Sequence, residues 1–596
     1  MSASAPEFTV SDYLAQRLRE LGVDHLFTVP GDYVTPFLDR LLAKKSLDVI
    51  PTPNEQIAGY AADGYARVRG IGAFAVTYGV GSFSALNAVA GSYVEHLPVI
   101  VINGSPSVKN REQARLQGVL FHHSTGAFGA DRDVYANVTT EALIVYDGDQ
   151  APAVIDAALV AAISRSRPVY IEVLKDVWDA PCARPAGTLE RTTFFCDKRA
   201  LAEAVEEAAG RLRRAKRSIV WTDVLVARYH LTEAFERFVR ETGLSYTTSI
   251  LGKSLLSEDT PGFVGTYDGP SADPETVREV EGADCILGLG VIVTDDYLNI
   301  INTDFSRMIL AGASSVRIAY HTYDNVPLES FLPALHARLV RDGAVAKHRT
   351  PARAKAARAG AHDAITFEGF FFDRMQRFIG EDMVLIPDES NSMYVAGSLH
   401  VAAQHGFFSQ AAWGSIGYAT GGALGIGCAA PHKRAIVFAG DGGFQQIAQA
   451  LAPMARLKQP AVVFLMNNDL YGIEQALIDL DYFDKGTPAP AYNVLDQWNY
   501  VELARAFGVQ AEQVRTFGQL DDLLERLKHT RVTTFVRVVI PSRDLPWQIR
   551  ALAAPPVPPP PAGARLAAAA PRPEGGPRLF ALASIPGPDP AEGDSG

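Results

Sequence analysis

Short apolar runs alternate with helical patterns along most of this 596-residue sequence. The alternation is typical of α/β layers, because strands that pair in parallel need a crossover connection, which is usually a helix. Three such blocks can be separated, covering residues 1–180, 195–345 and 362–548. The sequence therefore predicts an α/β fold of three doubly wound parallel-sheet domains.

The strands are predicted from apolar runs bounded by turn residues or helical patterns. In chain order they are HLFTVP (25–30), LDVIPT (47–52), AFAVTYG (73–79), PVIVING (98–104), PVYIEV (168–173), SIVWTD (218–223), CILGLGV (285–291), MILAGA (308–313), MVLIPD (383–388), RAIVFAG (434–440), AVVFLMNN (461–468) and TFVRVVI (534–540). The Ala/Arg-rich stretch 350–363 is interpreted as a linker. Residues 553–596 are dominated by Ala, Pro and Gly and predict a disordered tail.

Charge and composition narrow the class of partner. The net charge of −12 and the absence of polybasic runs argue against nucleic acid and anionic membranes. No stretch approaches 18 uninterrupted apolar residues, and the N-terminus lacks a basic region followed by a long apolar run. The four scattered cysteines form no CxxC pair and indicate free thiols in a reducing compartment. We therefore expect a cytoplasmic protein that binds small molecules.

A carboxylate stands among glycines in FAGDGGF (438–444), and MNND (466–469) follows. The segment 442–458 predicts one helix, so Asp441 and Asn468 end the two strands of a βαβ unit and face one crevice. Their oxygens suit Mg²⁺, and the amides of Gly442 and Gly443 at the helix start favour an anion. The alternative is a tight turn followed by a polar strand end; the pair at this spacing favours the metal site.

These motifs resemble the diphosphate and magnesium motif of thiamine-diphosphate enzymes. Further segments resemble one branch, the pyruvate, indolepyruvate and phenylpyruvate decarboxylases. They are PGDYVTPFLD (30–39), NEQIAGYAADGYAR (54–67), GVGSFSALNAVAGSYVEHLPV (79–99), FHHSTG (121–126), WGSIGYATG (413–421) and YGIEQALID (471–479). The resemblance covers about residues 8–548.

The resemblance implies a pyrimidine-binding first domain, a middle domain without bound nucleotide, and a third domain that binds diphosphate and Mg²⁺. It also implies active sites between subunits, and therefore a homodimer or homotetramer. The cofactor-binding residues that it implies are Glu55, Gly414, Ile416, Asp441, Gly442, Gly443, Asn468, Leu470 and Ile473, of which Asp441, Asn468 and the backbone oxygen of Leu470 would bind the metal.

Glu55 is the expected activator of the cofactor, because a carboxyl group that shares a proton with the pyrimidine ring turns the cofactor into its own base. Ile416 would hold the cofactor folded, and the carbonyl of Gly414 would accept a hydrogen bond from its amino group. Each residue has a plainer alternative. A glutamate near a helix N-terminus is favourable anyway, and most isoleucines are ordinary core.

The implied reaction is the non-oxidative decarboxylation of a 2-oxo acid to an aldehyde and carbon dioxide, through a cofactor ylid and an enamine. Protonation of the enamine requires acids. The candidates are Asp32, His122, His123 and Glu474. Histidine can donate or accept a proton near neutrality, although adjacent histidines are also common in ordinary loops.

Several positions depart from the family pattern. Leu470 and Gly443 replace smaller and larger residues, respectively, and DESNSMY (388–394) replaces a stretch that borders substrate and cofactor. Glu389 in that stretch is expected to repel a substrate carboxylate. Ile473 and Leu477 favour a small pocket, as for pyruvate, whereas Met393 favours longer chains.

Two other functions stay open. The first is a carboligase, which would trap the enamine with a second carbonyl compound; the adjacent histidines and Glu474 argue against it because they favour protonation. The second is a catalytically silent scaffold. The presence of Glu55, Asp441 and Asn468 argues against that reading.

Overall fold

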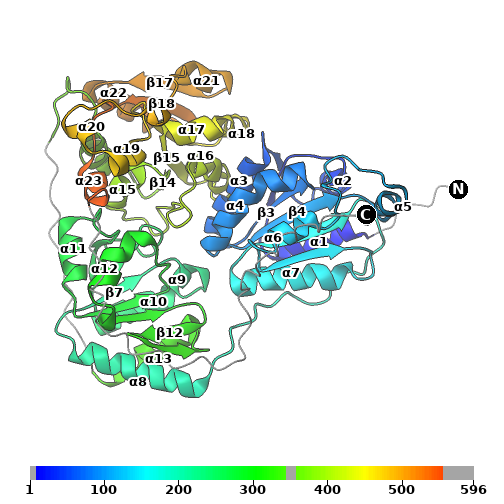
Figure 1. The fold of residues 1–596 in the computed structure, drawn as a ribbon, viewed down its shortest axis with the longest axis horizontal. Coiled ribbons are helices and arrows are strands. Elements are labelled where there is room, and N and C mark those ends of the chain that lie inside the picture. The colour runs from blue at the N-terminus through cyan, green and yellow to red at the C-terminus, as the bar shows by residue number, and fades with distance from the viewer. Residues whose placement is uncertain (1–7, 344–357, 555–596) are drawn as a thin grey trace, which may run out of the picture. The chain divides into compact units, whose positions relative to one another are not determined.

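The computed structural model of this protein describes residues 8–343 and 358–554. They lie in one compact unit with three α/β domains (Figure 1). Most of the predicted linker and nearly all of the predicted tail fall outside the described residues. Within the described ranges, no helix is long and apolar enough to cross a membrane.

The N-terminal domain has a six-stranded parallel sheet. Its spatial order is β2 (Asp48–Pro51), β1 (His25–Thr28), β3 (Gly72–Thr77), β4 (Val99–Ser105), β6 (Val169–Leu174) and β5 (Glu141–Val145). Its helices are α1 (Val10–Glu20), α2 (Thr35–Lys44), α3 (Glu55–Arg69), α4 (Val80–Val94), α5 (Val108–Gln117), α6 (Ala130–Tyr135) and α7 (Ala151–Arg165). Strand β5 was not predicted, because it is an edge strand that is buried only at its end and lacks a long apolar run.

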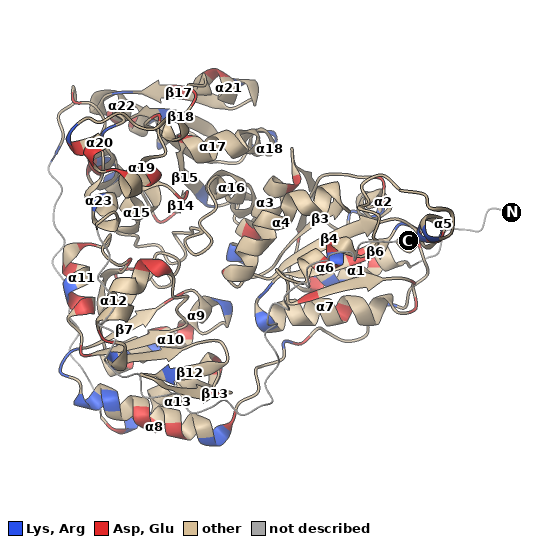
Figure 2. Ribbon diagram, in the orientation of Figure 1, with Lys and Arg blue, Asp and Glu red and all other residues tan. Residues whose placement is uncertain are grey.

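The middle domain has a seven-stranded sheet. Its order is β13 (His321–Asp324), β12 (Ser315–Ile318), β11 (Met308–Ala311), β10 (Cys285–Leu289), β7 (Ser218–Thr222), β8 (Tyr246–Thr248) and β9 (Phe263–Thr266). The parallel sheet ends in an antiparallel hairpin, β12 and β13, because the connections from β11 onward are too short for crossovers. Figure 2 shows acidic and basic residues interleaved along α8 (Lys198–Arg214), where ion pairs join Arg199 to Glu203 and Arg211 to Glu207.

The C-terminal domain has a five-stranded parallel sheet. Its order is β14 (Met383–Pro387), β15 (Arg434–Gly440), β16 (Val462–Asn467), β18 (Thr534–Val539) and β17 (Gln510–Val514). Its main helices are α15 (Asn391–Gly397), α16 (Tyr418–Ala429), α17 (Asp441–Ile447), α18 (Leu451–Arg456), α19 (Gly472–Ile478), α21 (Tyr500–Ala506), α22 (Phe517–Leu527) and α23 (Trp547–Leu552).

The predicted single helix over 442–458 is broken. The chain leaves helical geometry at Ile447, makes a 3₁₀ turn over Ala448–Ala450, and resumes as α18. Pro453 lies in the first turn of α18, where its missing N–H is tolerated; in a continuous helix that N–H would be required. Leu457, which a continuous helix would have included, lies past the end of α18 and is 36% exposed.

Helices α3 and α16 pack closely and join the N-terminal and C-terminal domains (Figure 1). A methyl group on Gly64 would lie 2.2 Å from the carbonyl oxygen of Gly422, and one on Gly425 would lie 1.8 Å from that of Ala61. Only glycine permits this approach of two backbones. The glycine-rich sequence of α16 therefore places its N-terminal loop against α3.

A buried ion network ties the N-terminal domain to that loop. Arg67 on α3 contacts Asp63 at 2.7 Å and Glu95 at 2.5 Å, and it donates to the carbonyl oxygen of Ser409 at 2.7 Å. Glu95 in turn accepts from the backbone N–H groups of Ala412 (2.9 Å) and Trp413 (3.2 Å). Two residues of the N-terminal domain thus hold residues 409–413.

We predict that Glu95→Ala destabilises the protein by about 3 to 5 kcal/mol, because it leaves the buried Arg67 charge without this partner. The midpoint of urea unfolding, followed by circular dichroism, measures the effect. Glu112→Ala, on the exposed helix α5, is the matched control and should change stability little. Equal midpoints for the two variants would contradict the prediction.

Candidate active site

Asp441 and Asn468 lie at the same edge of the C-terminal sheet. Strands β15 and β16 pair in parallel with Gly440 opposite Met466, and each is followed at once by one of the two residues. Asp441 accepts hydrogen bonds from the Asn467 side chain and from the Asp469 N–H, both at 2.7 Å. Asn468 is also buried.

The Asp441 carboxylate suits a cation site. Burial raises its pKa to about 6, although the hydrogen bonds from Asn467 and Asp469 act in the opposite direction. No ion pair to Asp441 is found in the described part of the chain, and the described residues contain no cluster of three or more His, Cys, Asp or Glu with metal-binding geometry. A divalent cation would stabilise the charged carboxylate, and the other protein ligands proposed for it, the Asn468 side chain and the Leu470 carbonyl, are neutral oxygens.

Gly442 and Gly443 are required for close packing rather than for an unusual backbone angle. A methyl group on Gly442 would lie 2.2 Å from the ring of Tyr471. One on Gly443 would lie 2.5 Å from a carboxylate oxygen of Asp388 and 2.9 Å from the nitrogen of Gly417. The Gly443 position therefore leaves room for Asp388, a residue for which the sequence analysis predicted no role.

Asp388 positions the segment that contains Gly414 and Ile416. Its carboxylate accepts from the backbone N–H groups of Gly417 at 2.8 Å and Ala419 at 3.0 Å, at the start of α16. Gly414 and Gly417 have φ of 67° and 91°, in the left-handed region that favours glycine. Ile416 is half-buried and lines a cavity, so it is not an ordinary core residue.

That segment is also fixed from the N-terminal domain. The Ser415 hydroxyl contacts Tyr60 at 2.6 Å and Asn87 at 2.8 Å. The indole N–H of Trp413 donates to Asn87 at 2.9 Å. Together with Glu95 and Asp388, these contacts leave the segment 409–419 little freedom.

A cavity of about 280 Å³ opens beside this segment. All the residues that line it belong to the C-terminal domain: Phe367, Glu389, Ser390, Asn391, Ser392, Ile416, Gly443, Met466, Asn468, Leu470, Tyr471, Gly472, Ile473 and Glu474. It brings together Ile416, Gly443, Asn468, Leu470, Ile473 and Glu474 from the predicted set. Met393 and Leu477 are not among the lining residues: the first is buried in the core and the second is 54% exposed. The two residues therefore do not report the size of this cavity.

Four other predicted residues, Asp32, Glu55, His122 and His123, lie on the N-terminal domain, whereas Gly414, Asp441 and Gly442 belong to the C-terminal domain but are not among the lining residues of its cavity. Asp32 and Glu55 follow β1 and β2, which are neighbours in the sheet. The carboxylate of Glu55 lies 3.5 Å from where a methyl group on Gly81 would stand, and the carbonyl of His123 lies against Gly79. Tyr78, between these glycines and β3, donates to the carbonyl oxygen of His122 at 2.5 Å.

Glu55 is not needed as a helix cap. Asn54 occupies that position, and its side chain accepts from the N–H of Ile57 at 2.8 Å. Asp32 is exposed and contacts Lys175 at 3.1 Å, and both histidines are exposed. None of Asp32, Glu55, His122 and His123 lines the cavity of the C-terminal domain.

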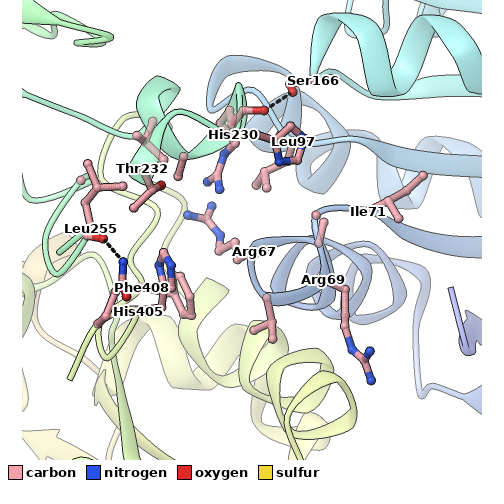
Figure 3. Close-up of a pocket in the computed structure, with 18 of the residues that line it drawn as sticks. Arg67, Arg69, Ile71, Leu97, Ser166, His230, Thr232, Leu255, His405 and Phe408 are labelled. Carbon is pink, nitrogen blue, oxygen red and sulfur yellow. Dashed lines mark hydrogen bonds between the residues drawn. The ribbon is translucent and has the colours of Figure 1, made fainter. Parts of the chain in front are cut away.

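A second cavity, of about 760 Å³, contains none of the predicted site residues. Its wall includes Arg67, Arg69, His230 and His405, which Figure 3 shows around it. It therefore lies beside the buried ion network of Arg67 and apart from the candidate active site.

Comparison with known proteins gives three family matches. Residues 8–125, 205–329 and 390–538 match the models of the N-terminal TPP binding domain, the central domain and the C-terminal TPP binding domain of thiamine pyrophosphate enzymes, respectively. The chain is 34% identical over 557 residues to an alpha-keto-acid decarboxylase from Mycolicibacterium paratuberculosis, covering 91% of this chain and 96% of that protein. It is 33% identical to an alpha-keto-acid decarboxylase from Mycobacterium leprae, with coverages of 92% and 95%.

A solved structure shares the fold. It is described as a putative thiamin diphosphate-dependent enzyme from Mycobacterium smegmatis, and it superposes with a TM-score of 0.72 at 19% identity. The match covers 90% of this chain and 100% of the other.

We predict that Gly443→Ala loosens the start of α16, because the added methyl group displaces Asp388 from the amides of Gly417 and Ala419. Overpacking of this kind should speed hydrogen exchange of the peptide 414–419 by roughly 5- to 150-fold. Gly312→Ala is the control, since a methyl group there makes only one ordinary contact, at 3.7 Å. Unchanged exchange in Gly443→Ala would contradict the role given to Asp388.

Proposed function

We propose a two-subunit active site for this chain, which belongs to the family of thiamine-diphosphate-dependent 2-oxo acid decarboxylases. The chain binds thiamine diphosphate and decarboxylates a 2-oxo acid. One observation supports the two-subunit site: the cavity of the C-terminal domain includes Ile416 and Asn468 in its wall but neither Glu55 nor the adjacent histidines. In the proposal, the C-terminal domain of one subunit and the N-terminal domain of another complete each site, in a homodimer or homotetramer.

The proposed metal is Mg²⁺, bound by Asp441, Asn468 and the backbone oxygen of Leu470. The buried carboxylate without an ionic partner supports this assignment, and so does the choice of hard oxygen donors. Gly442 and Gly443 would let the diphosphate approach the backbone at the start of α17. Ile473 lies in the same cavity wall and would contact the cofactor.

Thiamine diphosphate, when bound, supplies the nucleophilic carbon and the electron sink for decarboxylation. With the cofactor bound, Ile416 would support it, and the carbonyl of Gly414 would accept a hydrogen bond from its amino group. The carboxyl group of Glu55 holds a proton beside the pyrimidine ring. Its position as the first residue of α3, with Asn54 already capping the helix, leaves it available for that contact.

Proton delivery to the product is assigned to Asp32, His122, His123 and Glu474. Glu474 lies in the wall of the C-terminal cavity, and the other three lie at the strand ends and loop of the N-terminal domain. The two-subunit arrangement would bring both groups to one substrate. We also propose a cytoplasmic location, which the four free cysteines support.

The reaction is tested with purified protein, thiamine diphosphate and Mg²⁺ against pyruvate, 3-methyl-2-oxobutanoate, phenylpyruvate and indolepyruvate. Release of carbon dioxide with an equal amount of aldehyde supports the proposal. Accumulation of an acyloin or a 2-hydroxy-3-oxo acid instead would indicate a carboligase. Comparison of kcat/KM across the panel identifies the preferred side chain.

We predict that Asp441→Ala lowers the affinity for thiamine diphosphate in the presence of Mg²⁺ by at least about 100-fold, since loss even of a residue supporting a metal ligand costs 10- to 100-fold. Isothermal titration calorimetry measures this affinity. Asp522→Ala, an exposed carboxylate on α22, serves as the control. Wild-type affinity in Asp441→Ala would exclude this residue as a metal ligand.

We predict that the inactive variants Glu55→Gln and Asp441→Ala regain activity when co-expressed. In a mixed dimer one site combines both defects and the other has neither. Random pairing should therefore restore about a quarter of the wild-type activity, by the symmetry of a closed dimer. Each variant expressed alone is the control, and a mixture that stays inactive would show that each site lies within one chain.

A further inference from the structure

Glu389 stands in the wall of the proposed active site, in the stretch that departs from the family pattern. It lines the same cavity as Ile416, Asn468 and Glu474. Its carboxyl oxygen Oε2 lies 3.8 Å from where a methyl group on Gly414 would stand. The carboxyl group is therefore beside the backbone segment assigned to the cofactor amine, on a residue that lines the cavity.

The surroundings of Glu389 are acidic. Asp268 and Asp296 of the middle domain and the adjacent Asp388 act on it electrostatically, and Tyr394 on α15 forms a hydrogen bond with it. None of the residues that line the cavity is Lys, Arg or His, and in the described ranges no ion pair includes Glu389. A negative charge here would be repelled from several directions.

These surroundings favour the protonated form of the carboxyl group. Burial raises the pKa of Glu389 well above its ordinary value, and repulsion from Asp296, Asp388 and Asp268 raises it further. The Tyr394 hydrogen bond opposes this rise. The group that was expected to repel a substrate carboxylate is therefore less readily ionised than an ordinary glutamate.

We propose that Glu389 is a neutral carboxylic acid that donates a hydrogen bond to the carboxylate of the 2-oxo acid substrate. The proposal rests on the proposed function of the site. A hydrogen bond from a neutral acid holds the substrate carboxylate without neutralising it. Because the substrate loses this charge as carbon dioxide leaves, a full ion pair would stabilise the bound substrate more than the transition state. Glu389 therefore orients the substrate without slowing its decarboxylation appreciably.

The variant Glu389→Gln distinguishes a neutral from an ionised Glu389, because glutamine keeps the shape of the side chain and a hydrogen-bond donor but cannot ionise. If Glu389 is neutral, kcat/KM of this variant should stay within about threefold of wild type at pH 6 to 7, since a hydrogen bond from the neutral amide replaces one from the neutral acid. If Glu389 were ionised, the substitution would remove repulsion, and KM would fall well below the wild-type value. That result would overturn the proposal. Glu381→Gln, an exposed glutamate just before β14, is the matched control.

Glu389→Ala tests the hydrogen bond itself. KM should rise by roughly 10- to 100-fold, the usual value of a hydrogen bond to a charged group, while kcat changes less. An unchanged KM in this variant would show that Glu389 does not contact the substrate. Calorimetric affinity for thiamine diphosphate, expected to remain near wild type, shows that the variant is folded and loaded.

The pH dependence of kcat/KM provides an independent test of the proposal. The protonated form binds substrate, so wild-type kcat/KM should fall as pH rises through the pKa of Glu389, and this decline should be absent in Glu389→Gln. Asp296→Asn removes the strongest acidic neighbour and should move the decline to lower pH. An unchanged profile in both variants would contradict the proposal.

Infrared spectroscopy of the holoenzyme tests the protonation state without turnover. The difference spectrum between wild type and Glu389→Gln at neutral pH should contain the carbonyl stretching band of a protonated carboxyl group. Carboxylate bands in its place would overturn the proposal. Since this measurement needs no substrate, it distinguishes failure of the Glu389 assignment from failure of the decarboxylase function, which the carbon dioxide assay reports.

Discussion

The segment 409–419 is held by carboxylates on both of its sides, and the candidate site depends on this arrangement. Glu95, itself paired with Arg67, binds the amides of residues 412 and 413, and Asp388 binds those of residues 417 and 419. Between these anchors lie Gly414 and Ile416. Backbone N–H groups at a helix start need acceptors, and buried carboxylates are strong ones. The segment is thus fixed in shape before any cofactor binds.

Three carboxyl groups close to this segment have raised pKa values for the same reason. Asp388, Glu389 and Asp441 are all placed where burial disfavours their charged form. Each is stabilised differently: Asp388 by two backbone amides, Asp441 by Asn467 and Asp469, and Glu389 by little besides Tyr394. Clusters of such groups are typical of sites that bind ions or transfer protons. Differences in their hydrogen bonding allow them to serve different purposes around this segment.

The local part of this site could be predicted from the sequence. Asp441 and Asn468 end consecutive strands, so the βαβ rule alone places them at one edge of a sheet. Asp388 and Glu95 could not be assigned in this way, because the amides they bind lie about 30 and 317 positions away along the chain. The position of Met393 relative to the cavity could not be predicted for a related reason, because its place in α15 does not reveal which side of that helix faces the cavity. The break after Ile447 was missed because the apolar spacing of the 442–458 segment continues across it.

Helix α3 links the two halves of the proposed assembly. In that proposal its first residue, Glu55, would belong to the site completed by another subunit, whereas Tyr60 and Arg67 further along contact residues 415 and 409 of the same chain. The backbone hydrogen bonds of a helix fix the spacing of its residues along the axis. Close contact with α16 through Gly64 and Gly422 holds α3 against the C-terminal domain of its own chain. In the proposed dimer, α3 therefore contributes to two sites: Glu55 lies at one, and Tyr60 supports the segment that contains Ile416 at the other.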